Sequence, residues 1–107
     1  AVHAMHQDQV ISLPDDAEVI ARSEFCEFAA LAYGGIDAPR AISIQPHPEF
    51  EEPYERALIE LRRGDGIPEE VADPALQTLG APTDNSLIAD WFAAFLRQAR
   101  ARRRNAA

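Results

Sequence analysis

The first half of the chain alternates short apolar runs with turn residues, a pattern typical of β-strands. Apolar runs at 18–23, 28–33 and 41–45 predict three strands, and the first two are expected to pair as a hairpin. A further apolar run at 1–5 predicts the end of another strand. Strands therefore dominate the chain up to Phe50.

After Phe50 the hydrophobic pattern changes to the helical period. The segment 51–63 predicts a helix whose apolar stripe contains Tyr54, Ala57, Leu58 and Leu61. Acidic residues at its start interact favourably with the positive end of the helix dipole and so stabilise the helix. Two glycines that follow it, at 64 and 66, predict where it ends.

Two more helices are predicted towards the end of the chain. The segment 68–79 begins with a proline and is followed by Gly80, and we expect Pro74 to interrupt it. The segment 83–86 is rich in residues that cap helix N-termini, and it predicts a last helix that runs to about Arg103.

The last helix carries a wide apolar face. Its apolar residues recur at helical spacing and are Leu87, Ile88, Trp91, Phe92, Phe95, Leu96 and Ala99. We expect this face to pack on the sheet, and a partner interface is the alternative.

Candidate chemistry lies where the strand 41–45 ends. Gln45-Pro46-His47-Pro48-Glu49-Phe50 places a carboxylate two residues after a histidine, so both side chains can face one side of an extended segment. The two prolines favour extended conformations for the residues before them. A carboxylate can hold one ring nitrogen protonated and leave the other to accept a proton. A solvated loop is the structural alternative.

This segment resembles the Gln-x-His-Pro-Glu signature of class I (triad-type) glutamine amidotransferase domains. Upstream, His6-Gln7-Asp8-Gln9-Val10, followed by Leu13-Pro14, is similar to the His-x-Asp-x-Val…Leu-Pro segment of that family, most closely in the branch with the GMP synthase amidotransferase domain. Pro46 stands where the family more often has another apolar residue. The resemblance covers 1–50 well and the helices at 51–107 only in general character.

The resemblance implies an α/β fold in which residues 1–107 form the C-terminal half of one domain. That domain is a flavodoxin-like mixed-sheet sandwich with helices on its faces, and the half that carries the nucleophile is absent from this chain. The implied reaction hydrolyses glutamine to glutamate and ammonia through a Cys-His-Glu triad. His47 and Glu49 would be its catalytic residues, and His6 and Asp8 would help to bind the substrate.

The implied partners are glutamine, the missing N-terminal half and an ammonia-accepting synthetase subunit, with no cofactor. We therefore expect the chain alone to be inactive. Two alternatives remain. One is a non-catalytic amidotransferase-like module that binds a partner, and the other is a related hydrolase of γ-glutamyl bonds.

Two other candidate sites are weaker. Cys26 lies between Glu24 and Glu27, which disfavour a thiolate, so we interpret this cysteine as structural. His3, His6 and Asp8 have no obvious fourth ligand, so no metal site is predicted. For His6 and Asp8, a loop in which Asp8 caps backbone N–H groups is the structural alternative.

Charge narrows the choice of partners. The chain has a net charge of −8, with 18 acidic residues and ten arginines, but no lysine. All 18 acidic residues and five arginines lie in 1–96, which carries −13, whereas 97–107 carries +5. An acidic body argues against nucleic acid as the main partner. The arginine-rich end is typical of a helix C-terminus, with an RNA or acidic partner as the alternative. The single cysteine and the absence of a membrane span or signal pattern indicate a cytoplasmic protein.

Overall fold

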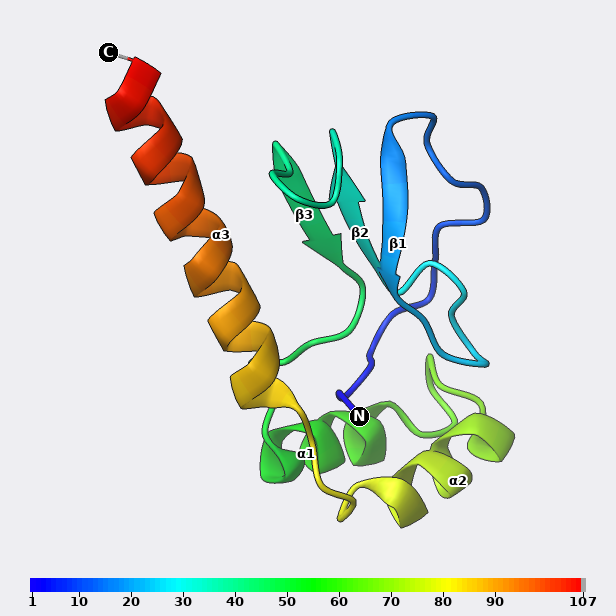
Figure 1. The fold of residues 1–107 in the computed structure, drawn as a ribbon. Coiled ribbons are helices and arrows are strands. Elements are labelled where there is room, and N and C mark those ends of the chain that lie inside the picture. Colours follow the sequence, from blue (N-terminus) through cyan, green and yellow to red (C-terminus); the bar gives the residue numbers. More distant parts are fainter. Residues whose placement is uncertain (107) are drawn as a thin grey trace.

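The computed structural model describes residues 1–106, and its three strands form one antiparallel sheet. The strands are β1 (Ala17–Ala21), β2 (Ala30–Tyr33) and β3 (Ala41–Ile44), arranged in the order β1-β2-β3 (Figure 1). The predicted hairpin between the first two strands is confirmed, with Ala17 opposite Tyr33 and an irregularity between Val19 and Ala21.

The buried strand of this sheet is β2. Its residues Ala30, Leu31 and Ala32 are all at most 3% exposed, and successive side chains point to opposite faces, so both faces of β2 are covered. In β3, by contrast, exposed and half-buried residues alternate because successive side chains point to opposite faces of the sheet, and β3 is an edge strand that pairs only with β2. The strand that leads to His47 is therefore at the rim of the sheet.

The three predicted helices are present near their expected bounds. They are α1 (Glu52–Arg62), α2 (Glu69–Thr78) and α3 (Asn85–Ala106). In Figure 1, α1 and α2 lie together below the sheet, and α3 runs along the side next to β3. Ile59 of α1 packs with Ala72 of α2 and with Leu79 to form a small apolar core under the sheet.

The predicted apolar stripe of α1 is wrong. Tyr54 is 53% exposed and Leu61 is 74% exposed, whereas Glu55 and Ile59 are the buried residues of the helix. These two residues are four positions apart and share a face. The contacts with α2 and the N-terminal segment decide which face of α1 is buried. The hydrophobic periodicity of the sequence predicted a different face.

The predicted interruption at Pro74 is also wrong. The helix α2 continues through Pro74, which is exposed. Proline lacks the N–H that would bond to the carbonyl four residues earlier.

Arg63 links the turn before α2 to the helix itself, since its guanidinium donates to Asp73 at 2.7 and 3.1 Å and to Glu69 at 2.9 Å.

The N-terminal residues 1–5 do not form the predicted strand. The carbonyl of His3 accepts the backbone N–H of His47 at 2.7 Å, and the carbonyl of Ala1 accepts that of Asp84 at 2.7 Å. A strand requires consecutive ladder bonds to one neighbour. These two bonds reach different neighbours, so they hold the segment in place without a regular ladder.

The apolar face of α3 is only partly covered, so the expectation that it packs on the sheet holds for part of the helix. Ile88 is 5% exposed, but Trp91 is 39% and Leu96 is 63% exposed. Between α3 and the sheet lies a cleft of about 220 Å³, whose lining includes Ile42 and Phe95. The fold is thus a small α/β arrangement in which helices meet one antiparallel sheet.

Candidate active site

The candidate site is the turn that follows β3, and backbone hydrogen bonds hold it on two sides. The N–H of Gln45 donates to the carbonyl of Ala29 at 2.8 Å, and the N–H of His47 donates to that of His3 at 2.7 Å. The N–H of Phe50 donates to the carbonyl of His47 at 3.1 Å and closes the turn. Pro46 has no N–H, so the bonds fall on the residues beside it.

This turn joins the side chains of His47 and Glu49. The Nδ1 atom of His47 lies 2.7 Å from Oε1 of Glu49. The hydrogen bond from His47 is the main reason that the pKa of Glu49 is lowered from its ordinary value. The histidine side chain is 34% exposed and that of the glutamate 61%. With Nδ1 bonded to the carboxylate, Nε2 is the ring nitrogen that can exchange a proton with a reactant.

An aromatic cluster lies against the imidazole. The ring of Phe50 is stacked on that of His47, with centroids 4.3 Å apart and an interplanar angle of 8°. Tyr54 meets Phe50 edge-on at 4.7 Å and 69°. This role of Phe50 was not predicted from the sequence, although its position three residues after the histidine, just before a helix, is a usable signal.

Glu55 is a second carboxyl group that the sequence analysis missed. It is 2% exposed, and within residues 1–106 its Oε2 atom has no hydrogen-bond partner. Burial raises the pKa of Glu55, while the charges of His3 and His47 act in the opposite direction. Glu55 lines a cavity of about 310 Å³ between the N-terminal segment and the helices α1 and α2. The burial of Glu55 was not predictable from the hydrophobic pattern of α1, because that pattern placed Tyr54 on the buried face of the helix.

The structure places the other two predicted site residues together, but in a separate contact. The Nδ1 atom of His6 lies 2.9 Å from the backbone carbonyl oxygen of Asp8. Its Nε2 atom is buried and has no hydrogen-bond partner among the residues that the structure describes, while Asp8 is exposed. In the N-terminal segment, the residue whose backbone carbonyl bonds to His47 is His3.

Cys26 is buried at 3% exposure and lies in the loop between β1 and β2. Its N–H donates to Oγ of Ser23 at 3.0 Å, and its carbonyl accepts the N–H of Ser23 at 2.9 Å. These bonds give the residue a structural role in the loop. In the sequence, Cys26 lies between Glu24 and Glu27, whose negative charges disfavour a thiolate.

The part of the chain that the structure describes contains no group of three or more His, Cys, Asp or Glu side chains that could hold a metal ion. Among the same residues, no helix combines the length and apolar character needed to cross a membrane.

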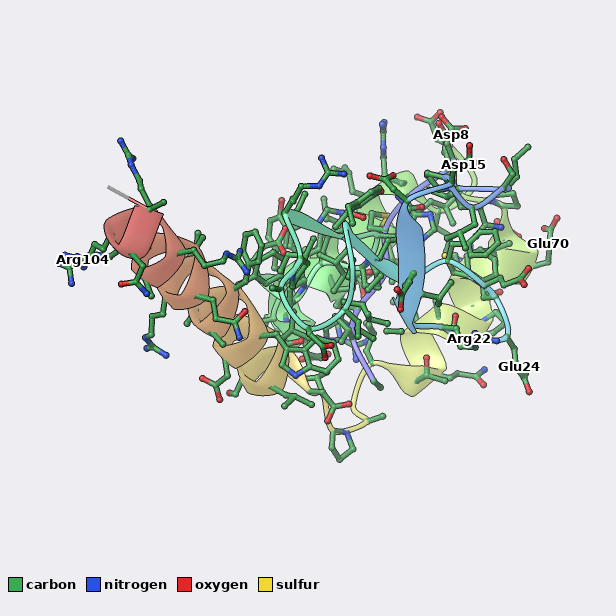
Figure 2. The ribbon with its side chains drawn as sticks, turned by 45° about the horizontal axis from the view of Figure 1, so that its top comes forward. Asp8, Asp15, Arg22, Glu24, Glu70 and Arg104 are labelled. Carbon is green, nitrogen blue, oxygen red and sulfur yellow. The ribbon has the colours of Figure 1, made fainter. Side chains whose placement is uncertain are left out.

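Charge is distributed unevenly over the molecule. In Figure 2, Asp8, Asp15, Glu24 and Glu70 lie at one end and Arg104 lies at the other. Arg22 is a basic residue at the acidic end in the same view. The basic end is the last part of α3.

The chain is 30% identical over 97 residues to a protein of Schizosaccharomyces pombe whose name describes it as glutamine amidotransferase-like. The match covers 89% of this chain and 37% of the relative, so the chain spans little more than a third of that protein. No family model matches the chain. No solved structure matches it either.

Proposed function

We propose that this chain is the C-terminal half of a class I, triad-type glutamine amidotransferase domain and that it supplies the histidine and glutamate of a Cys-His-Glu triad. The observation that carries the proposal is the 2.7 Å contact between His47 Nδ1 and Glu49 Oε1. It occurs in the Gln-Pro-His-Pro-Glu-Phe segment of a chain that is similar to an amidotransferase-like protein.

In the proposed reaction, a cysteine from outside this chain attacks the side-chain carboxamide of glutamine. His47 accepts the thiol proton on Nε2 and then donates it to the leaving ammonia, so that a glutamyl thioester forms. Water, deprotonated by His47, then attacks the thioester carbonyl, and glutamate leaves as the thiol is restored. Glu49 holds Nδ1 protonated and orients the ring throughout.

The remaining parts of the proposal come from the resemblance. His6 and Asp8 would contribute to the glutamine pocket, where His6 would offer a buried nitrogen that has no hydrogen-bond partner in the described part of the chain. The complete domain would have the flavodoxin-like mixed sheet, to which the three antiparallel strands contribute one part. The branch with GMP synthase is the nearest in motif, and a separate synthetase subunit would receive the ammonia.

A glutaminase assay tests this proposal. Glutamate release from glutamine is measured for residues 1–107 alone and for the same residues joined to the nucleophile-bearing N-terminal half of the domain that the proposal requires. We expect activity only in the joined protein. His47→Gln should reduce kcat by about 10³-fold or more, because the base and acid are lost together.

The matched control is His3→Gln. This substitution also removes an imidazole, but His3 is bonded to His47 through its backbone carbonyl and not through its side chain. Activity of residues 1–107 alone would overturn the requirement for a second half. Full activity of the joined His47→Gln protein would overturn the triad. Cleavage of γ-glutamyl peptides in preference to glutamine would identify the related hydrolase instead.

A further inference from the structure

The ring of Phe50 covers one face of the His47 imidazole. The two rings are nearly parallel, with 8° between their planes and 4.3 Å between their centroids. The hydrogen bond to Glu49 fixes one edge of the imidazole, but it leaves the ring free to tilt about that bond. A flat aromatic surface against the face of the ring restricts this second motion.

Phe50 is itself held from two directions. Tyr54, one turn into α1, meets its ring edge-on at 4.7 Å, a favourable geometry for an aromatic pair. The Nδ2 atom of Asn85, the first residue of α3, donates to the carbonyl of Phe50 at 3.4 Å. Asn85 is 35 residues from Phe50 in sequence. The start of α3 is thereby connected to the turn that carries His47.

We propose that Phe50 is a positioning residue for His47 and that Asn85 holds Phe50 in place. This inference rests on the proposed function, because it assigns the stack a role in aiming Nε2 at the reacting thiol. Small displacements of a catalytic group lower the rate strongly without removing any reacting atom. A leucine at position 50 would fill space but would present no flat surface to the imidazole.

The first test is made by NMR on residues 1–107, independently of activity. We expect nuclear Overhauser contacts between the His47 and Phe50 rings and an upfield shift of the His47 ring protons. We also expect the ring to be protonated on Nδ1 in its neutral form. Phe50→Leu should abolish the upfield shift and raise the mobility of the His47 ring in relaxation measurements, whereas Phe50→Trp should retain both the shift and the low mobility. Asn85→Asp, which removes the donor to Phe50, should reduce the shift partially.

Phe95→Leu is the matched control, because Phe95 lines the cleft between α3 and the sheet, away from the turn. It should leave the His47 signals unchanged. Absence of ring-to-ring contacts in the unsubstituted chain would overturn the proposal. A Phe50→Leu variant that is folded by circular dichroism and keeps the His47 signals unchanged would overturn it as well.

The second test uses the glutaminase assay of the joined protein. Phe50→Leu should lower kcat about tenfold with little change in the KM for glutamine, and Phe50→Trp should restore most of the rate. Unchanged kcat in Phe50→Leu would overturn the positioning role. If the unsubstituted joined protein has no glutaminase activity, the proposed function fails. The NMR result still decides whether Phe50 orients the imidazole.

Discussion

At the scale of single residues, the contact between His47 and Glu49 was predictable because it is local. The partners are two positions apart with only Pro48 between them, and Pro46 and Pro48 limit the conformations of this segment. The stack on Phe50 is also local, but it depends on where α1 begins. The burial of Glu55 was not predictable, since it depends on the face of α1 that its neighbours cover.

The state of Glu49 depends on its histidine neighbour. His47→Gln should raise the pKa of Glu49 towards its ordinary value, because the hydrogen bond from His47 is the main cause of the lowered pKa. Carbon-13 NMR of the Glu49 carboxyl group as a function of pH measures this change. An unchanged pKa of Glu49 in the variant would contradict the assignment.

A lowered carboxyl pKa stabilises the fold above the unfolded-state pKa of about 4.3, and the stabilisation is lost as the pH falls through the lowered folded-state pKa. The difference in free energy of unfolding between the unsubstituted chain and His47→Gln should therefore narrow in acid. Urea unfolding at a series of pH values checks this sign.

Glu55 should have the opposite effect. Burial raises its pKa in the folded chain, so its carboxyl group favours folding below about pH 4.3, and this contribution is lost as the pH rises through the folded-state pKa. Glu55→Gln removes the charge and should be more stable at neutral pH by about 1 kcal/mol. The advantage should disappear in acid.

Urea unfolding at neutral and acidic pH measures the effect of Glu55→Gln, with Glu60→Gln as the control because Glu60 is an exposed residue of the same helix. Equal stability of Glu55→Gln and the unsubstituted chain at every pH would show that the buried carboxyl group carries no such cost.

At the scale of elements, the periodic patterns located the three strands and three helices well. Chain-local signals were sufficient because glycines, prolines and capping residues stand at the ends of the predicted segments. The errors arose where packing decides. The run at 1–5 has a strand-like composition without a ladder partner, and Pro74 is accommodated inside α2.

The two helix prolines should respond differently to replacement. Pro74→Ala should raise the free energy of unfolding by roughly 1–3 kcal/mol, since Pro74 lies inside α2, where its missing N–H leaves a carbonyl unbonded. Pro53→Ala is the matched control. Pro53 lies in the first turn of α1, where backbone N–H groups have no intrahelical partner, and its replacement should bring no gain.

Urea unfolding of both variants measures this difference. A loss of stability in Pro74→Ala would mean that the ring itself supports the packing of α2 and would contradict the expectation.

At the scale of the whole molecule, α3 is anchored by a buried residue near its start and linked by a hydrogen bond near its other end. Ile88 is buried near its start, and Arg102 donates to the carbonyl of Pro39 at 3.0 Å near its other end. The cleft lies between these attachments, and Figure 1 shows the C-terminal end of the helix extending beyond the sheet. The long apolar face of α3 that the sequence predicts is therefore only partly buried within residues 1–106.

The two ends of α3 should differ in hydrogen exchange. Backbone amides at 97–106 should exchange much faster than those at 88–92, because few buried apolar contacts oppose local opening there. Amides of β2 should exchange slowest of all. Exchange measured by NMR or mass spectrometry checks this order, and Arg102→Gln should accelerate exchange at the end of the helix. Uniform protection along α3 would contradict this description.

The sequence by itself determined the order of the elements, the turn after the third strand and the pairing of His47 with Glu49. Each of these depends on residues close together in the chain, where spacing and proline geometry set the outcome. Only the tertiary structure decided that β2 is the buried strand, that α1 turns Glu55 inward and that Asn85 reaches Phe50 from 35 residues away. Those features depend on which faces of the helices and the sheet pack against one another. The spacing of residues along the chain does not specify this packing.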